Sequence, residues 1–138
     1  MSESWQKRLL IAAAAWNILG GIGALVDPAA HFAQMYRGSL DLTDPLQAAF
    51  FRTVWIAVIA WGFAYLAAAF RPEGRWPVLL AGGAGKLAYA AACAVAYEQG
   101  AATTALLAVG YADLVFGALF FMIAVEGITP SRMEVKRA

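Results

Sequence analysis

Four long apolar segments are the feature that most constrains how this chain can fold. They cover approximately residues 9–26, 46–70, 76–97 and 102–125. A helix that crosses the hydrocarbon core of a bilayer needs about 20 predominantly apolar residues, and each segment reaches or approaches that length. We therefore predict an all-α integral membrane protein in which residues 1–138 form a single domain of four transmembrane helices.

The composition agrees with a membrane protein and argues against several classes of function. Only 14% of the 138 residues are charged and 62% are hydrophobic, whereas soluble domains carry roughly 25% charged residues. A net charge of +1 provides no general attraction for nucleic acid, so no nucleic-acid partner is expected. The single cysteine, Cys93, and the single histidine, His31, exclude an intrachain disulfide and bis-histidine haem ligation by one copy. We expect no metal site and no cofactor.

The first apolar segment follows Lys7 and Arg8, which is also how a cleaved signal peptide begins. Its apolar run is long for the hydrophobic region of a signal peptide, and Trp16 and Asn17 interrupt it. We therefore expect that the first span is retained.

The lysines and arginines indicate the orientation of the spans. They concentrate near the N-terminus, in the loop between the second and third spans, and in the C-terminal tail. Because cytoplasmic loops of membrane proteins carry an excess of these residues, both termini are expected in the cytoplasm. The loops are short, so consecutive spans should be antiparallel, and the predicted architecture is an up-down four-helix bundle.

The first outer loop contains two signals for the start of a helix. Asp27-Pro28 and Asp44-Pro45 each place a capping carboxylate before a proline at the first helical position. The first pair predicts a short helix from Pro28 to about Arg37, ended by the glycine that follows and resting on the membrane surface. The second pair predicts the start of the second span.

Two residues of opposite charge lie at matching depths in consecutive spans. Lys86 is about 15 Å from the cytoplasmic end of the third span, and Asp113 is about 18 Å from that of the fourth. A charge at the bilayer centre costs about 2.5–3.5 kcal/mol on insertion scales, so we predict that the two form a buried pair. Asn17, about 13 Å deep in the first span, is expected to join them through a hydrogen bond.

Small residues accompany these polar residues on the same helix faces. Small side chains allow the backbones of membrane helices to approach closely, so these faces should point into the bundle. Tyr89 lies one turn beyond Lys86 and either extends the polar site or packs against a neighbour. Arg52, about a turn inside the second span, either pairs with Glu98 or reaches the outer surface. The small residues are Gly21, Ala24, Gly82, Cys93, Gly110 and Gly117.

Several short motifs are shared with known membrane proteins. They are Asn17 with Gly20 and Gly21, Phe51-Arg52, Gly85-Lys86, and Asp113-Leu114 followed by Phe120. Together they resemble a class of small bacterial four-span proteins that is loosely similar to the DoxX-like group. This resemblance implies a bacterial inner membrane and a four-helix bundle, and it assigns no catalytic residue to this sequence.

Two classes of function follow from these observations. In the first, the protein is a non-catalytic subunit or accessory protein of a membrane complex, or a homo-oligomer, and Asn17, Lys86 and Asp113 form a lock between helices. In the second, these residues, together with Tyr89 and Arg52, bind, transport or isomerise a small lipophilic or anionic molecule. The short loops and the lack of a catalytic motif favour the first class. A lipid-facing cleft beside Lys86 would favour the second.

Overall fold

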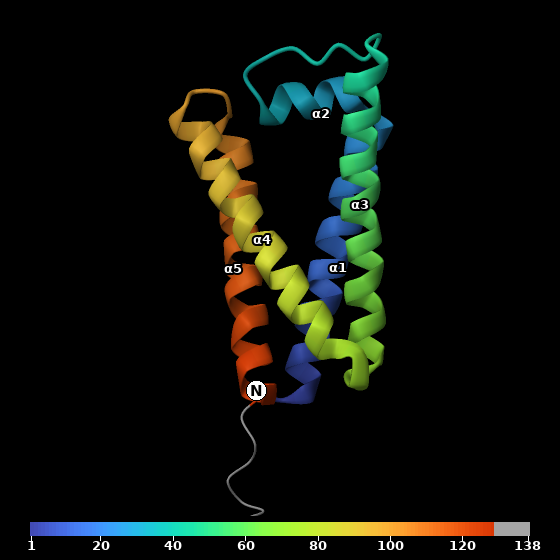
Figure 1. The fold of residues 1–138 in the computed structure, drawn as a ribbon, viewed down its shortest axis with the longest axis vertical. Helices are drawn as coiled ribbons and strands as arrows, with labels where there is room; N and C mark the ends of the chain where they lie inside the picture. Colours follow the sequence, from blue (N-terminus) through green and yellow to red (C-terminus); the bar gives the residue numbers. More distant parts are fainter. Residues whose placement is uncertain (129–138) are drawn as a thin grey trace, which may run out of the picture.

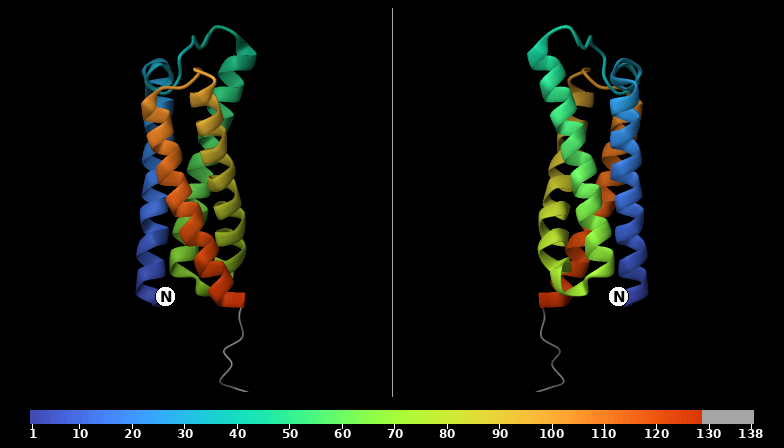
Figure 2. Two further views of the ribbon diagram at one scale, coloured as in Figure 1. Left: turned by 90° about the vertical axis from the view of Figure 1, so that its left-hand side faces the viewer. Right: turned by 90° about the vertical axis from the view of Figure 1, so that its right-hand side faces the viewer.

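The computed structural model describes residues 1–128, in which all the regular secondary structure is helical apart from one isolated β-bridge. Four helices are long and apolar enough to cross a membrane: α1 (Glu3–Val26), α3 (Pro45–Phe70), α4 (Arg75–Glu98) and α5 (Thr104–Ile128). They alternate in direction, so the N-terminus and the end of α5 lie at the same end of the molecule (Figures 1 and 2). The all-α prediction is confirmed. The predicted spans lie within these helices except for residues 102 and 103, which lie in the loop before α5.

The four helices form two antiparallel pairs and not an evenly packed bundle. Helix α1 packs along α3, and α4 packs along α5, whereas contacts from one pair to the other are sparse. Figure 1 shows the two pairs meeting near the end that holds the N-terminus and diverging toward the other end. The predicted up-down order is therefore present, but the packing is uneven.

Glycines bring the two backbones of each pair together. A Cβ atom on Gly62 of α3 would lie 2.6 Å from Cγ1 of Ile18 and 3.1 Å from the carbonyl oxygen of Ala14, both in α1. A Cβ atom on Gly117 of α5 would lie 2.9 Å from Cδ2 of Leu87 in α4. A larger residue at either position would push the helices apart, so the close packing within each pair depends on these glycines.

The main hydrophobic core fills the end at which the two pairs meet. Tyr65 of α3 and Phe120 of α5 are buried there and contact each other edge to face, with ring centroids 5.2 Å apart. Leu10 of α1 and Leu79 of α4 belong to the same cluster, so all four long helices contribute to it. The two pairs are held together at this end mainly by apolar packing.

A short helix, α2 (Pro28–Met35), lies across the gap at the other end (Figure 1). Asp27 caps it by accepting a hydrogen bond from the backbone amide of Ala30 at 3.0 Å, and Pro28 stands in its first turn, as the sequence predicts. The helix ends at Met35, two residues before the approximate end predicted at Arg37.

Backbone pairing with the loop before α5 explains this early end. The amide of Arg37 donates to the carbonyl of Ala101 at 2.9 Å, and the amide of Thr103 donates to the carbonyl of Met35 at 3.0 Å. The Thr103 hydroxyl also donates to the carbonyl of Gln34 at 2.7 Å. The chain must become extended to make these bonds, and they attach α2 to the second helix pair.

The other connections are short. Asp44 accepts a hydrogen bond from the amide of Leu46 at 2.8 Å and so caps α3, as predicted. A short 3₁₀ turn, η1 (Pro72–Gly74), joins α3 to α4. Gly100 follows α4 with φ +73°, a backbone conformation that favours glycine, and the tight turn leads directly into the loop before α5.

Gly62→Val should destabilise the protein, because the new side chain would meet the α1 backbone, which cannot move by itself. Overpacking of this kind typically costs about 1–3 kcal/mol. The free energy of SDS-induced unfolding would measure the loss. Gly20→Val is the matched control, since a Cβ atom on Gly20 has no heavy atom within 4 Å. Equal stability of the two variants would contradict the close approach of α1 and α3.

Candidate functional site

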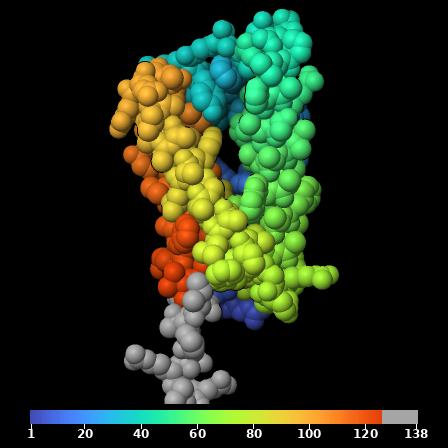
Figure 3. Space-filling model, in the orientation of Figure 1, coloured from blue at the N-terminus to red at the C-terminus, as the bar shows by residue number. Residues whose placement is uncertain are grey.

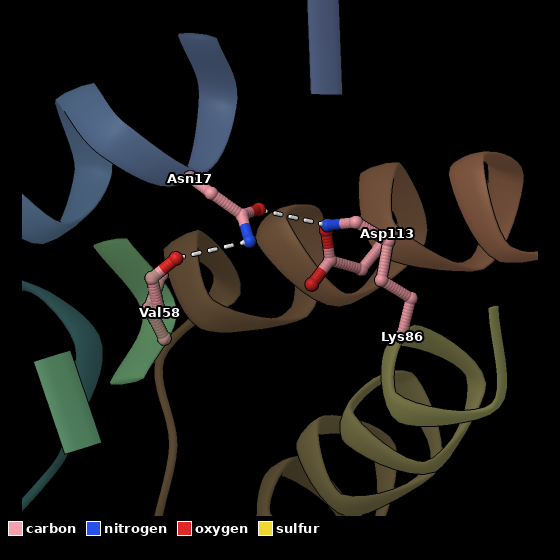
Figure 4. A network of polar contacts seen from close by, with 4 residues as sticks. All are labelled: Asn17, Val58, Lys86 and Asp113. Carbon is pink, nitrogen blue, oxygen red and sulfur yellow. Dashed lines mark hydrogen bonds and ion pairs between the residues drawn. The ribbon is translucent and has the colours of Figure 1, made fainter. Parts of the chain in front are cut away.

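A polar cluster of Asn17, Lys86 and Asp113 joins the two helix pairs near the middle of the long helices. Lys86 Nζ, from α4, donates to Oδ1 of Asp113 in α5 at 2.6 Å. It also donates to Oδ1 of Asn17 in α1 at 3.0 Å. Figure 4 shows both contacts. The structure thus brings together the three residues whose depths the sequence predicts to match.

Asn17 extends the polar cluster to the remaining long helix. Its Nδ2 donates to the backbone carbonyl of Val58 in α3 at 3.3 Å (Figure 4). This carbonyl is within reach because Gly62, one turn further along α3, lets α1 approach closely, and a Cβ atom there would lie 3.3 Å from Cβ of Asn17. The polar cluster therefore contacts all four long helices.

The cluster is almost completely buried. The exposed fractions are 4% for Lys86 and 8% for both Asn17 and Asp113. Burying one unpaired charge in an apolar environment is strongly unfavourable, so the ammonium and the carboxylate stabilise each other by forming a neutral pair. Lys86 Nζ also lies 5.2 Å from the ring centroid of Phe116 and 5.8 Å from that of Tyr65, which adds attraction to the aromatic faces.

Some hydrogen-bonding capacity of the cluster remains unused. A lysine ammonium has three donors, and Lys86 uses two of them. Oδ2 of Asp113 accepts no hydrogen bond from the residues that the structure describes, and in Figure 4 it points away from Lys86 Nζ. The Asp113 side chain is 11% exposed, and Oδ2 is not among the enclosed, unpartnered polar atoms of the described chain. This oxygen is therefore unpartnered and not fully enclosed.

A cleft lies on the α2 side of the polar cluster, between α3 and α4. The space-filling view shows this hollow, with α1 behind it and α2 across its far end (Figure 3). On the α2 side of the polar cluster, the close contacts are between the two helices of each pair. A Cβ atom on Gly21 of α1 would meet Ile59 of α3, and one on Gly110 of α5 would meet Cys93 of α4. Because the hydrogen bonds of the polar cluster join the two pairs near the middle of the long helices, we take the cluster as the floor of the cleft and α2 as its roof.

His31 lies on α2, the roof of the cleft, and the sequence alone assigns it no role in the site. Its ring contacts Trp55 of α3 edge to face, with centroids 4.6 Å apart. Nε2 is enclosed and has no hydrogen-bond partner among the described residues. Burial lowers the pKa of His31 below its usual value of 6.5, so the imidazole is neutral at pH 7. The helix-start signal of Asp27 and Pro28 places His31 on the predicted helix, but it does not place the ring against Trp55.

Tyr89 does not extend the polar cluster by a direct hydrogen bond to Lys86. Its side chain packs instead with Tyr36 near Cys93, in a small cluster that attaches the end of α2 to the second helix pair. Burial raises the pKa of Tyr36 above its usual value of 10.0, so this hydroxyl is neutral at pH 7. Tyr89 thus lies one turn from Lys86 along α4 and packs with the segment that attaches the end of α2.

Arg52 and Glu98 do not form an ion pair, which was one of the two expectations for Arg52. Both side chains are exposed, and the structure has no ion pair between them. The physical reason is the divergence of α3 and α4 toward this end of the molecule (Figure 1). Arg52 therefore lies outside the candidate site.

Arg75 belongs to the basic segment between the second and third predicted spans, and the structure buries it. It is 6% exposed, its Nε donates to the carbonyl of Ala68 at 3.1 Å, and its Nη1 donates to Oε1 of Gln6 at 2.8 Å. The last carbonyls of a helix lack partners within the helix and attract cations. The position of Arg75 just after the end of α3 was the available signal.

The outside of the α4–α5 pair carries a shallow apolar groove of about 400 Å³. It lies away from the polar cluster and is formed by small and aliphatic residues with one tyrosine. Small residues of this kind are typical of surfaces on which membrane helices pack. The lining residues are Leu87, Ala90, Ala91, Ala94, Leu107, Gly110, Tyr111 and Leu114.

Within the described residues, no group of three histidine, cysteine, aspartate or glutamate side chains could hold a metal ion. Comparison of the chain with protein-family models, with curated proteins and with solved structures gives no match. The polar cluster and the cleft above it are therefore the features on which a functional proposal can rest.

Lys86→Met and Asp113→Leu should each destabilise the protein, because each leaves an unpaired charge in the core. Removing one partner of a buried pair typically costs about 3–5 kcal/mol, whereas replacing both is often nearly neutral. The double variant should therefore resist SDS-induced unfolding better than either single variant. If the two single effects were small and additive, the ion pair would not contribute to folding.

Proposed function

We propose that the protein is a non-catalytic integral membrane protein that binds a small lipophilic molecule in the cleft, with the polar end of that molecule at the polar cluster. The observation that carries this proposal is the position of Asp113. Its carboxylate belongs to the polar cluster that joins the two helix pairs where the cleft between them ends, and one of its oxygens has no partner among the described residues. A lock alone would need neither the cleft nor the free oxygen.

The membrane setting is supported by the exposed surface of the long helices. Many large apolar side chains on them are more than half exposed, which is unfavourable in water but suits contact with lipid. They include Leu19, Val26, Leu46, Phe50, Phe63, Val115 and Val125. Location in a bacterial inner membrane rests on the resemblance to small four-span bacterial proteins.

The orientation is part of the same proposal. Lys7, Arg8 and Arg71 all belong to the end of the molecule at which the N-terminus and the end of α5 lie. Since positively charged residues favour the cytoplasmic side, this end is cytoplasmic and α2 lies at the outer surface. The cleft then opens within the outer half of the bilayer, where a lipid-soluble molecule can enter between α3 and α4.

A second candidate function is that of an accessory protein that packs against another membrane helix, from a partner or a second copy. The groove on α4 and α5 favours it, because its alanines would allow close approach of a helix. The two candidates use different surfaces. They can be separated by changing the polar cluster without changing the groove.

Native mass spectrometry of the protein released from its host membrane tests the binding proposal. The wild type should carry a bound small molecule, and the double variant Lys86→Met/Asp113→Leu should lose roughly nine-tenths of that occupancy, since a hydrogen bond to a charged group contributes about tenfold in affinity. The double variant Arg71→Met/Glu73→Gln is the matched control. It removes one positive and one negative charge from exposed positions, and it should bind as the wild type does.

The absence of any bound small molecule from the wild type, or equal occupancy in both double variants, would contradict the binding proposal. A bound protein that persists in both double variants would favour the accessory function.

A further inference from the structure

We infer that the cleft takes an uncharged lipophilic alcohol or phenol, whose hydroxyl group donates to Oδ2 of Asp113 and accepts from the remaining N–H of Lys86. This inference rests on the proposed binding function and specifies its ligand class. It also replaces the anionic ligand that the sequence suggested for Lys86.

The charge balance of the polar cluster argues for a neutral ligand. Lys86 and Asp113 already form a neutral pair at 2.6 Å, and no other charged side chain takes part in their hydrogen bonds. A carboxylate or phosphate placed beside them would leave a net negative charge in an apolar environment, and an ammonium would leave a net positive charge. Either excess charge would be strongly unfavourable there.

The unused hydrogen-bonding groups narrow the choice further. The Asn17 oxygen accepts from Lys86, and one of the two N–H groups of its amide donates to Val58. What remains is one carboxylate oxygen without a partner, Oδ2 of Asp113, and two donors, the third N–H of Lys86 and the second N–H of Asn17. A hydroxyl group is both a donor and an acceptor, so it can donate to Oδ2 of Asp113 and accept from Lys86 at once. A carboxylate offers only acceptors, and an ammonium offers only donors.

The dimensions and the walls of the cleft indicate the apolar part of the ligand. From Asn17 at the floor to Val26 at the end of α1, the helix rises about 14 Å, which suits a chain of about ten carbon atoms. Trp55 lies near the roof, because it contacts His31 of α2. The far end of such a chain would therefore reach the neighbourhood of Trp55.

Quenching of Trp55 fluorescence by bromine-labelled ligands tests this inference. Three probes share one chain and differ only in the polar end: 10-bromodecan-1-ol, 10-bromodecanoate and 10-bromodecylammonium. They are added to the full-length protein in lipid vesicles, in a variant whose other tryptophans (Trp5, Trp16, Trp61 and Trp76) are replaced by phenylalanine. The alcohol should quench Trp55 saturably, at a concentration roughly tenfold lower than the two charged probes need.

Two controls separate binding from partition into lipid. A variant that keeps Trp76 alone should show only unsaturable quenching, because Trp76 lies near the closed end of the bundle, in the first turn of α4. The double variant Lys86→Met/Asp113→Leu should lose the saturable quenching of Trp55 by the alcohol. Native mass spectrometry of the wild type with the same probes should give the same order of affinity without any tryptophan replacement.

The outcomes distinguish this inference from the function on which it rests. Tighter binding of the decanoate or the ammonium probe than of the alcohol would overturn the ligand class and leave the binding function intact. Failure of all three probes to bind saturably, in both the fluorescence and the mass measurements, would overturn both.

Discussion

The arrangement of this protein depends on the ion pair between Lys86 and Asp113, whose Nζ and Oδ1 atoms lie 2.6 Å apart. Neither side chain can stay charged at this buried position without the other, because burying an unpaired charge in an apolar environment is energetically unfavourable. The pair therefore requires α4 and α5 to keep one register, and the bond from Lys86 to Asn17 requires α1 to keep its place beside them. Through Asn17 and the carbonyl of Val58, α3 is drawn into the same constraint. The hydrogen bonds of the polar cluster therefore connect all four long helices, from both pairs, near their middles.

The cleft follows from the difference between packing within the pairs and packing between them. Glycines such as Gly62 and Gly117 allow the helices of each pair to touch along their length. Between the pairs, apolar packing is confined to the core around Tyr65 and Phe120, on one side of the polar cluster. On the other side the helices diverge, and the bonds from Thr103 to the end of α2 hold the far ends together across the gap. The result is a cleft between the two pairs with the polar cluster at one end and α2 at the other, and a recess that holds a few polar groups is the usual construction of a site for a small amphipathic molecule.

Helical geometry and bilayer thickness were sufficient to predict the polar cluster. A rise of 1.5 Å per residue places Asn17, Lys86 and Asp113 at similar depths, and the cost of a lone buried charge makes their contact the favoured arrangement. Capping chemistry likewise predicted α2 from Asp27 and Pro28. What could not be predicted depends on tertiary packing. The divergence of the pairs separates Arg52 from Glu98, the bridge to the loop before α5 ends α2 at Met35, and Tyr89 turns toward Tyr36 and Cys93 instead of Lys86. No local pattern in the sequence encodes the angle between two helix pairs.

Solid-state NMR of the protein in lipid bilayers tests the central interaction most directly. With isotope labels on the lysine side-chain nitrogens and the aspartate carboxylate carbons, the short distance between Lys86 and Asp113 should produce one strong dipolar coupling. This coupling should disappear in Lys86→Met and in Asp113→Leu, which also assigns it. A Lys86 nitrogen that shows no coupling to a carboxylate carbon and exchanges its protons rapidly with water would contradict the account.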